Sequence, residues 1–169
     1  MGPSPSLADR IHPCVLVRRE PIGVMVRVRY DDAPLGLIVH AGARDAAVRL
    51  LMSRSEGEIL ERSRSCRFAP SDHDEAAMLA KMIRNKLQDI SRRPISGRQV
   101  EAILGVSGAE RRRWTRAGLL PTIGESRISA GPRLLSLRTY SAETIEALMV
   151  DDRAIKAWRS LDAQTAFRR

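Results

Sequence analysis

The chain has few cysteines, few aromatic residues and no long apolar run. Its two cysteines, Cys14 and Cys66, are too few for a disulfide framework, so we expect a reduced, cytoplasmic protein. No stretch has the pattern of a signal peptide or the length of a membrane-spanning helix, so no membrane partner is expected. Because aromatic residues make up only 4% of the chain, the cores must be built largely from Val, Leu, Ile, Met and Ala.

Known catalytic motifs are also missing from the sequence. There is no glycine-rich phosphate loop, no pair of catalytic carboxylates and no nucleophile elbow. Four residues of zinc-ligand type lack the close spacing of structural zinc sites: His12, Cys14, Cys66 and His73. We therefore expect neither an enzyme nor a bound cofactor or metal, and a metal-dependent nuclease is the least favoured alternative.

The net charge of +9 is concentrated in one part of the chain. Residues 92–140 contain 10 basic and 3 acidic side chains, whereas residues 1–91 contain 14 and 12. A concentrated positive charge favours a polyanionic partner, because neutralised phosphates release their counterions. This distribution predicts that the segment 92–140 binds double-stranded DNA.

Two helix-start signals lie eleven residues apart in this basic segment. Ser96 with Gln99, and Ser107 with Glu110, have the spacing of a capping box. In a capping box the serine oxygen and the side chain three residues later satisfy exposed backbone N–H groups. Two short consecutive helices are therefore predicted.

Glycines mark the ends of both helices. Gly105 can adopt the positive φ that ends the first helix, and Gly118, with Pro121 shortly after it, can end the second. A helix, a tight turn and a second helix form a helix-turn-helix. We therefore predict a helix-turn-helix whose second helix spans about residues 108–117.

The second helix carries a run of arginines. At about 100° per residue, Arg112, Arg113 and Arg116 lie within one arc of about 100°, while Arg111 and Trp114 lie towards the other side. Clustered guanidinium groups can bind phosphates and the O6/N7 edge of guanine. The alternative interpretation of the same run is a solvated helix face.

These residues resemble a known family. The chain contains the pattern Val106-Ser107-x-x-x-x-Arg112-Arg113-Trp114-x-Arg116-x-Gly118-Leu119-Leu120-Pro121, followed by Arg138-x-Tyr140. This pattern resembles the winged helix-turn-helix of MerR-type regulators and excisionase-like proteins. The resemblance covers about residues 96–149. It implies a recognition helix in the major groove, a wing at about 125–138 on the DNA backbone and a following helix. Arg111 stands where the family has an inward-pointing Leu or Val, so the arginine must snorkel or the helix must rotate.

The resemblance and the charge pattern together predict the DNA-binding residues. We expect Arg112, Arg113 and Arg116 to contact bases or neighbouring phosphates, and most other arginines to contact the backbone. Trp114 and Tyr140 are expected mainly to hold the recognition helix and the wing together. The predicted set is Arg98, Arg111, Arg112, Arg113, Trp114, Arg116, Arg127, Arg133, Arg138 and Tyr140.

The first ninety residues show no such resemblance. Alternation of apolar residues predicts a strand at 22–30, and shorter apolar runs predict strands at 14–17 and 35–40. Helical spacing predicts helices at 43–53 and from about residue 72 to just before Pro94. We expect residues 54–71, which are polar and lack periodicity, to form a loop or short irregular helices.

The predicted fold class is therefore α+β, with two domains joined at residues 91–95. Residues 11–91 form a small module of three strands plus helices, whose role is dimerisation, partner binding or sensing. Residues 95–165 form the winged helix-turn-helix domain with a C-terminal helix. That helix is predicted to start at Ser141 and to continue past Trp158, so that its second half could reach a partner subunit.

The function predicted from these features is sequence-specific DNA binding. We expect a transcription regulator of bacterial or phage origin that acts as a homodimer. One alternative is an architectural DNA-binding protein, such as a recombination directionality factor or a small terminase subunit. Another is an adaptor whose N-terminal module engages RNA polymerase or another regulator.

Overall fold

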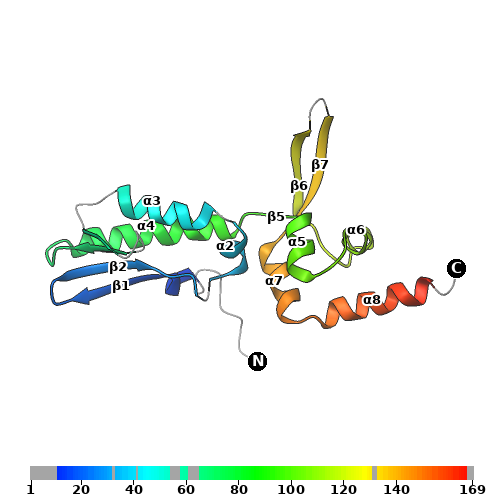
Figure 1. The fold of residues 1–169 in the computed structure, drawn as a ribbon, viewed down its shortest axis with the longest axis horizontal. Helices are drawn as coiled ribbons and strands as arrows, with labels where there is room; N and C mark the ends of the chain where they lie inside the picture. The colour runs from blue at the N-terminus through cyan, green and yellow to red at the C-terminus, as the bar shows by residue number, and fades with distance from the viewer. Residues whose placement is uncertain are drawn as a thin grey trace. The chain divides into compact units, whose positions relative to one another are not determined.

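The protein is a mixed α and β structure in two compact units, residues 1–92 and 93–169 (Figure 1). The computed structural model describes residues 11–31, 33–40, 42–53, 58–60, 65–130 and 133–166. Each unit contains one small antiparallel sheet. Among the residues described, no helix combines the length and the apolar character needed to cross a membrane.

Unit 1 is built on a four-stranded antiparallel sheet. After a short 3-10 turn (His12–Cys14), the strands lie in the spatial order β1, β2, β4, β3. Their bounds are β1 (Val15–Glu20), β2 (Gly23–Val28), β3 (Glu58–Leu60) and β4 (Ser65–Phe68). Val17 lies opposite Val26, and Val26 opposite Cys66, so alternate residues of three strands share one face.

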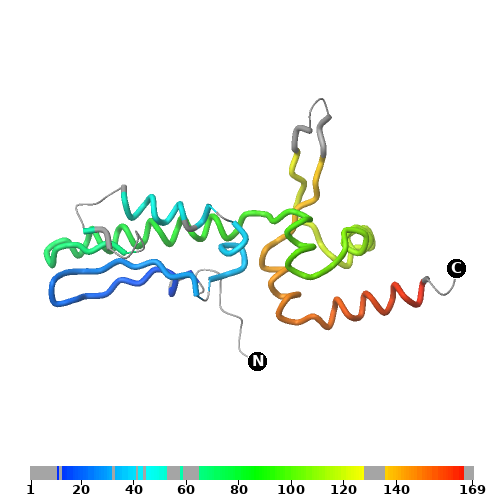
Figure 2. Tube along the Cα trace, in the orientation of Figure 1, coloured from blue at the N-terminus to red at the C-terminus, as the bar shows by residue number. Residues whose placement is uncertain are grey.

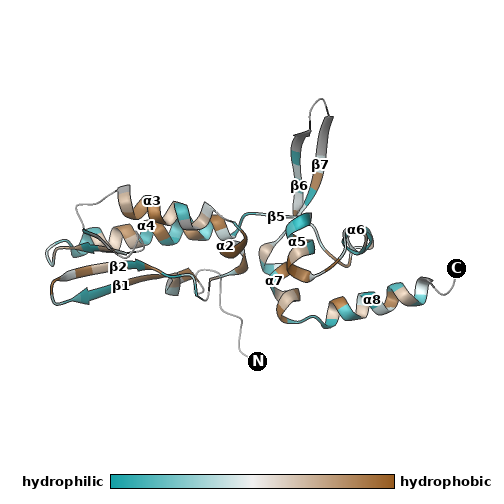
Figure 3. Cartoon of the chain, in the orientation of Figure 1, coloured by the Kyte–Doolittle hydropathy of each residue, from teal (hydrophilic) through white to brown (hydrophobic). Residues whose placement is uncertain are grey.

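Helix α4 (His73–Ser91) packs against β1 and β2, and α3 (Gly42–Ser53) lies beside α4 (Figure 2). Apolar residues of both helices and of the sheet form one core. Along α4, buried apolar residues recur every three or four positions, and polar residues lie between them (Figure 3). Leu79, Ile83 and Leu87 are at most 1% exposed and belong to the same core as Val24 and Val26. The predicted helices at 43–53 and from about 72 to before Pro94 are confirmed, as is the central part of the strand predicted at 22–30.

The strand predicted at 35–40 is wrong, because residues Leu35–Val39 form a short helix, α2. All five residues of this run are apolar or glycine, and Leu35 and Leu37 are buried. A short run without polar residues has no periodicity that distinguishes a helix from a strand. The helix packs closely on α4: a Cβ added at Gly36 would lie 2.1 Å from the carbonyl oxygen of Ser91. Only glycine permits that approach.

The loop predicted at 54–71 is also wrong where the structure describes it, since β3 and β4 complete the sheet there. Residues 54–57 and 61–64 lie outside the described residues. Strands of three and four residues are too short to show alternation. Arg67, in the middle of β4, forms an ion pair at 3.1 Å with Glu58, its cross-strand neighbour on β3, and another at 3.6 Å with Glu20 of β1.

Unit 2 consists of two short helices, a three-stranded sheet and two further helices. The sheet has the order β5, β7, β6, and β6 and β7 form an antiparallel hairpin. The bounds are β5 (Ile95–Ser96), α5 (Gly97–Leu104), α6 (Gly108–Arg116), β6 (Gly124–Ala130), β7 (Arg133–Tyr140), α7 (Ala142–Val150) and α8 (Arg153–Ala166). The hairpin occupies the segment predicted as the wing, and residues 131–132 at its turn lie outside the described residues.

Both predicted capping boxes are present. Ser107 Oγ accepts from the Glu110 N–H, and the Glu110 carboxylate accepts from the Ser107 N–H; Ser96 and Gln99 make the same pair of bonds. The turn between α5 and α6 contains Gly105 with φ of 61° in the left-handed region. The start of both helices and the turn between them therefore follow the predicted pattern.

The single C-terminal helix predicted after Ser141 is wrong, because it is divided into α7 and α8 at Asp151. Asp151 has extended backbone angles, φ −123° and ψ 94°, which end α7. Its carboxylate then accepts hydrogen bonds from the backbone N–H and the guanidinium of Arg153, the first residue of α8. This local side-chain bond stabilises a change of direction that the apolar spacing does not indicate.

Candidate nucleic-acid interface

The arginine-rich helix α6 has one exposed and one buried face. Arg112, Arg113 and Arg116 are exposed, whereas Trp114 and Thr115 are buried at 1% and 8%. All three arginines of the predicted arc are exposed, but Arg113 bonds Asp162 of α8, whereas Arg112 and Arg116 lie together with Arg111. The buried face packs into unit 2, so its contacts determine where the exposed arginines lie.

A hollow of about 180 Å³ lies between α6 and β7. Four arginines line it together with Thr115: Arg111, Arg112, Arg116 and Arg138. No carboxylate is among its lining residues. In the described part of the chain, the side chains of Arg112, Arg116 and Arg138 have no hydrogen bond or ion pair. The fold therefore brings three arginines that have no ion pair in the described structure from two elements to one concave surface.

The fourth arginine, Arg111, is held by contacts within unit 2. Its Nε donates to Glu101 Oε1 at 2.8 Å, and its Nη1 donates to the Tyr140 hydroxyl at 2.8 Å. The same hydroxyl lies 3.0 Å from Thr115 Oγ1. Burial opposes the charged form of the guanidinium, but the bonds to Glu101 and Tyr140 raise the pKa of Arg111. Arg111 thus links α5, α6 and β7 and forms one wall of the hollow.

A small residue on α5 leaves room for this arginine. A Cβ added at Gly97 would lie 2.6 Å from Arg111 Cζ. The long side chain therefore reaches Glu101 and Tyr140 across the surface of α5, with 15% of it exposed. Such a course is the snorkelling that an arginine at an inward-pointing position requires.

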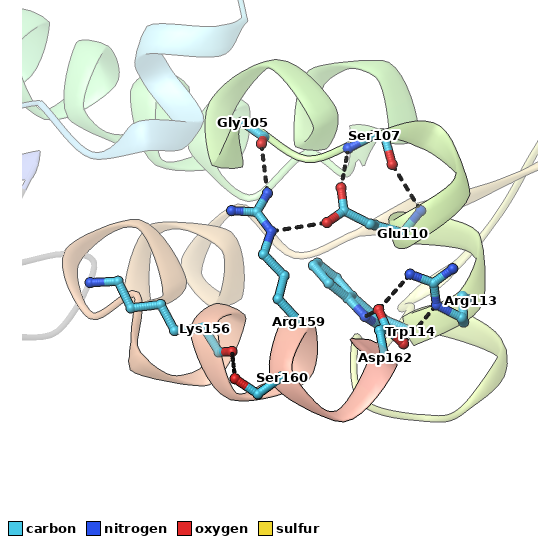
Figure 4. A network of polar contacts seen from close by, with 9 residues as sticks. All are labelled: Gly105, Ser107, Glu110, Arg113, Trp114, Lys156, Arg159, Ser160 and Asp162. Carbon is cyan, nitrogen blue, oxygen red and sulfur yellow. Dashed lines mark hydrogen bonds and ion pairs between the residues drawn. The ribbon is translucent and has the colours of Figure 1, made fainter. Parts of the chain in front are cut away.

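Helix α8 holds Arg113 and Trp114 through one carboxylate (Figure 4). Asp162 Oδ1 accepts from Arg113 Nε at 2.7 Å, while Oδ2 accepts from Arg113 Nη2 and from Trp114 Nε1, the latter at 2.9 Å. The indole of Trp114 also packs on that of Trp158, with ring centroids 5.1 Å apart. The hydrogen bond from Arg113 lowers the pKa of Asp162, so this carboxylate is charged near neutral pH.

A second side chain of α8, Arg159, holds the turn between α5 and α6 (Figure 4). Its Nε donates to Glu110 Oε1 at 2.9 Å, and its Nη2 donates to the Gly105 carbonyl at 3.0 Å. The backbone N–H of Ser107 and then the Arg159 guanidinium lower the pKa of Glu110 to about 2. The capping box of α6 is therefore part of a larger ionic network that includes α8.

None of the remaining predicted residues whose side chains the structure describes lines the hollow. Arg98 on α5 and Arg127 on β6 are exposed, and neither lines it. The side chain of Arg133 lies outside the described residues. Tyr140 is fully buried, which agrees with a role in holding α6 and β7 together.

Four residues that position the site were not predicted: Glu101, Thr115, Arg159 and Asp162. Arg159 and Asp162 lie about fifty positions from their partners in the chain. No local spacing could have indicated these pairs.

The zinc-ligand candidates of unit 1 do not form a site in the described structure. Cys14 and Cys66 are buried free cysteines, and burial raises the pKa of the Cys66 thiol. The side chain of His12 lies outside the described residues. Among those that are described, no three His, Cys, Asp or Glu side chains gather as metal ligands.

Comparisons with protein-family models, with curated proteins and with solved structures find no match to this chain. The function of unit 2 therefore has to be inferred from its own geometry and charge.

Proposed function

We propose that unit 2 is a winged helix-turn-helix that binds double-stranded DNA, with α6 in the major groove and the β6–β7 hairpin on the backbone. The observation that carries this proposal is the hollow between α6 and β7, which four arginines line without a carboxylate. Like charges held this close repel one another unless an anion lies between them. A DNA phosphate is an anion that would relieve this repulsion. In this arrangement the DNA backbone would run from α6 to the hairpin.

The arginines of this interface have separate roles in the proposal. Arg112 and Arg116 project from the exposed face of α6 and contact base edges or the phosphates beside them. Arg138 contributes from β7 and contacts the backbone, which sets the register of the protein on DNA. Arg111, already bonded to Glu101 and Tyr140, shapes the hollow and adds its charge.

The proposed biological role is a transcription regulator of bacterial or phage origin that acts as a homodimer. Unit 1 has its own apolar core and a nearly balanced charge, which fits dimerisation, partner binding or sensing better than DNA binding. In a dimer, two copies of α6 would contact half-sites about 34–36 Å apart, one turn of DNA. A palindromic binding site with this spacing is expected.

The test is a selection of random-sequence duplexes by the purified protein, with sequencing of the bound pool at two salt concentrations. We expect an enriched motif and an affinity that falls as salt rises. Arg112→Ala should cost about 1 to 3 kcal/mol at the selected site. Lys156→Gln is the matched control, because it removes one exposed cation of unit 2 on α8 outside the hollow.

Three other outcomes would change the proposal. Equal loss on selected and random DNA in Arg112→Ala would reduce Arg112 to a phosphate contact. Binding that bends DNA without an enriched motif would favour the architectural alternative. Absence of DNA binding at both salt concentrations would overturn the proposal.

A further inference from the structure

We propose that Asp162 limits the affinity of the protein for DNA of any sequence by neutralising Arg113, an inference that rests on the function proposed above. The geometry points to this role because Asp162 lies on α8, outside the helix-turn-helix. It nevertheless forms an ion pair with Arg113 on the exposed side of α6. In the described structure, the exposed arginines Arg112 and Arg116 of the same helix have no ion pair.

The bond between Arg113 and Asp162 occupies one of the two edges of the guanidinium that can form paired hydrogen bonds. Nε and Nη2 form two roughly parallel hydrogen bonds with the two carboxylate oxygens. A phosphate or a guanine would use this same bidentate arrangement. The carboxylate therefore competes directly with DNA for Arg113.

Arg113 is otherwise accessible to a polyanion. Its side chain is 51% exposed, whereas that of Asp162 is 24% exposed. It also lies in the same arc as Arg112 and Arg116, which line the arginine hollow. Without a negative partner, Arg113 would add another phosphate contact beside them.

Such a contact would carry no sequence information. Phosphate contacts strengthen binding to all sequences, whereas base contacts separate one sequence from another. Neutralising Arg113 therefore lowers the affinity for all DNA, the selected site and random sequences alike, and leaves the discrimination between sequences to Arg112 and Arg116. Trp114 Nε1 also donates to Asp162, which holds the carboxylate in place beside Arg113.

The test is the salt dependence of binding to a random-sequence duplex by the full chain and by Asp162→Asn. Asparagine retains an oxygen that can accept from Trp114 but lacks the charge that neutralises Arg113. We expect the slope of log K against log salt to become more negative by about 0.9, and random DNA to bind about 5- to 10-fold more tightly near 0.1 M salt. The selected site should gain by the same factor, so its preference over random DNA should stay unchanged.

Two further variants separate this role from a structural one. Asp152→Asn removes the same charge from the start of α8, where Asp152 pairs with Lys156, and should leave the slope unchanged. Arg113→Gln, which leaves Asp162 in place, should also leave the slope unchanged. This variant tests the proposal even if Asp162→Asn does not fold.

The outcomes distinguish this inference from the proposed function. If the unaltered protein binds DNA and Asp162→Asn has an equal or shallower slope, Asp162 is only a structural anchor and the inference is overturned. A shallower slope in Arg113→Gln would likewise overturn it, because Arg113 would then already contact phosphate. Failure of the unaltered protein to bind DNA would instead overturn the proposed function, and the inference with it.

Discussion

The two units of the protein are stabilised by different kinds of contact. Unit 1 buries Val, Leu, Ile and Ala side chains between its sheet and two helices, with Phe68 among them. Among the residues whose side chains are described, unit 2 buries fewer apolar side chains than unit 1. A network of charged and polar side chains connects its elements α5, α6, β7 and α8. The comparison indicates that unit 2 can expose several arginines on one side of α6 because hydrogen bonds and ion pairs to α5, β7 and α8 hold that helix in place.

The largest expected effect tests whether the two cores are separate. Ile83→Ala removes a fully buried side chain of α4 and should destabilise unit 1 by about 2–5 kcal/mol. Both tryptophans of the chain, Trp114 and Trp158, lie in unit 2. In urea, the circular dichroism transition should therefore shift while the tryptophan fluorescence transition does not. A parallel shift of both signals would show that the units unfold together.

A second prediction concerns the contact between α2 and α4 in unit 1. Gly36→Ala should cost about 1–3 kcal/mol, because the new Cβ would collide with the Ser91 carbonyl. Gly42→Ala is the matched control, since no atom lies within 4 Å of its added Cβ. The measurement is the urea midpoint followed by circular dichroism. An increase in stability on Gly36→Ala would contradict the packing of α2 described above.

The polar network of unit 2 supplies a third prediction. Tyr140→Phe removes the hydroxyl that bonds Arg111 and Thr115, and it should cost about 1–3 kcal/mol, because Thr115 is buried and would lose this partner. Tryptophan fluorescence in urea reports the change. Ser136→Ala, on the exposed hairpin, should change stability by less than about 0.5 kcal/mol. Equal effects of the two variants would show that the network contributes little.

The smallest expected effect is a pH dependence of the stability of unit 2. The pKa of Glu110 is about 2 in the folded protein, below its ordinary value of 4.5, so its stabilising contribution is present above 4.5 and is lost as pH falls through about 2. The free energy of unfolding should fall over this range, and less steeply in Glu110→Gln. Thermal unfolding monitored by tryptophan fluorescence between those pH values measures both. Glu143→Gln on α7 is the matched control. If the free energy of unfolding depended on pH equally steeply in the unaltered protein, in Glu110→Gln and in this control, the role of Glu110 would be contradicted.

Local signals predicted the elements of unit 2 better than those of unit 1. The capping boxes at Ser96 and Ser107 and the glycine at 105 act within a few residues, so the sequence alone indicates where α5 and α6 begin and where their turn lies. In unit 1, the short strand β4 and the short helix α2 have no comparable signal. Their conformation depends on neighbours, such as Glu58 beside Arg67 and Ser91 beside Gly36.

The candidate site divides in the same way. Helical spacing alone placed Arg112, Arg113 and Arg116 on one exposed face, and it could not show that these arginines have different partners. Asp162 neutralises Arg113, and Glu101 with Tyr140 anchors Arg111. Arg112, Arg116 and Arg138 remain around the hollow.

The sequence by itself determined the α+β class, the basic segment, the capped helices and the exposed arginine face, because each depends on composition or on residues within one or two helical turns. Only the tertiary structure decided the strand order of unit 1, the division of α7 from α8 and the pairing of Asp162 and Arg159 with α6. These features join residues far apart in the chain, and a contact of that kind depends on how whole elements pack rather than on any local pattern.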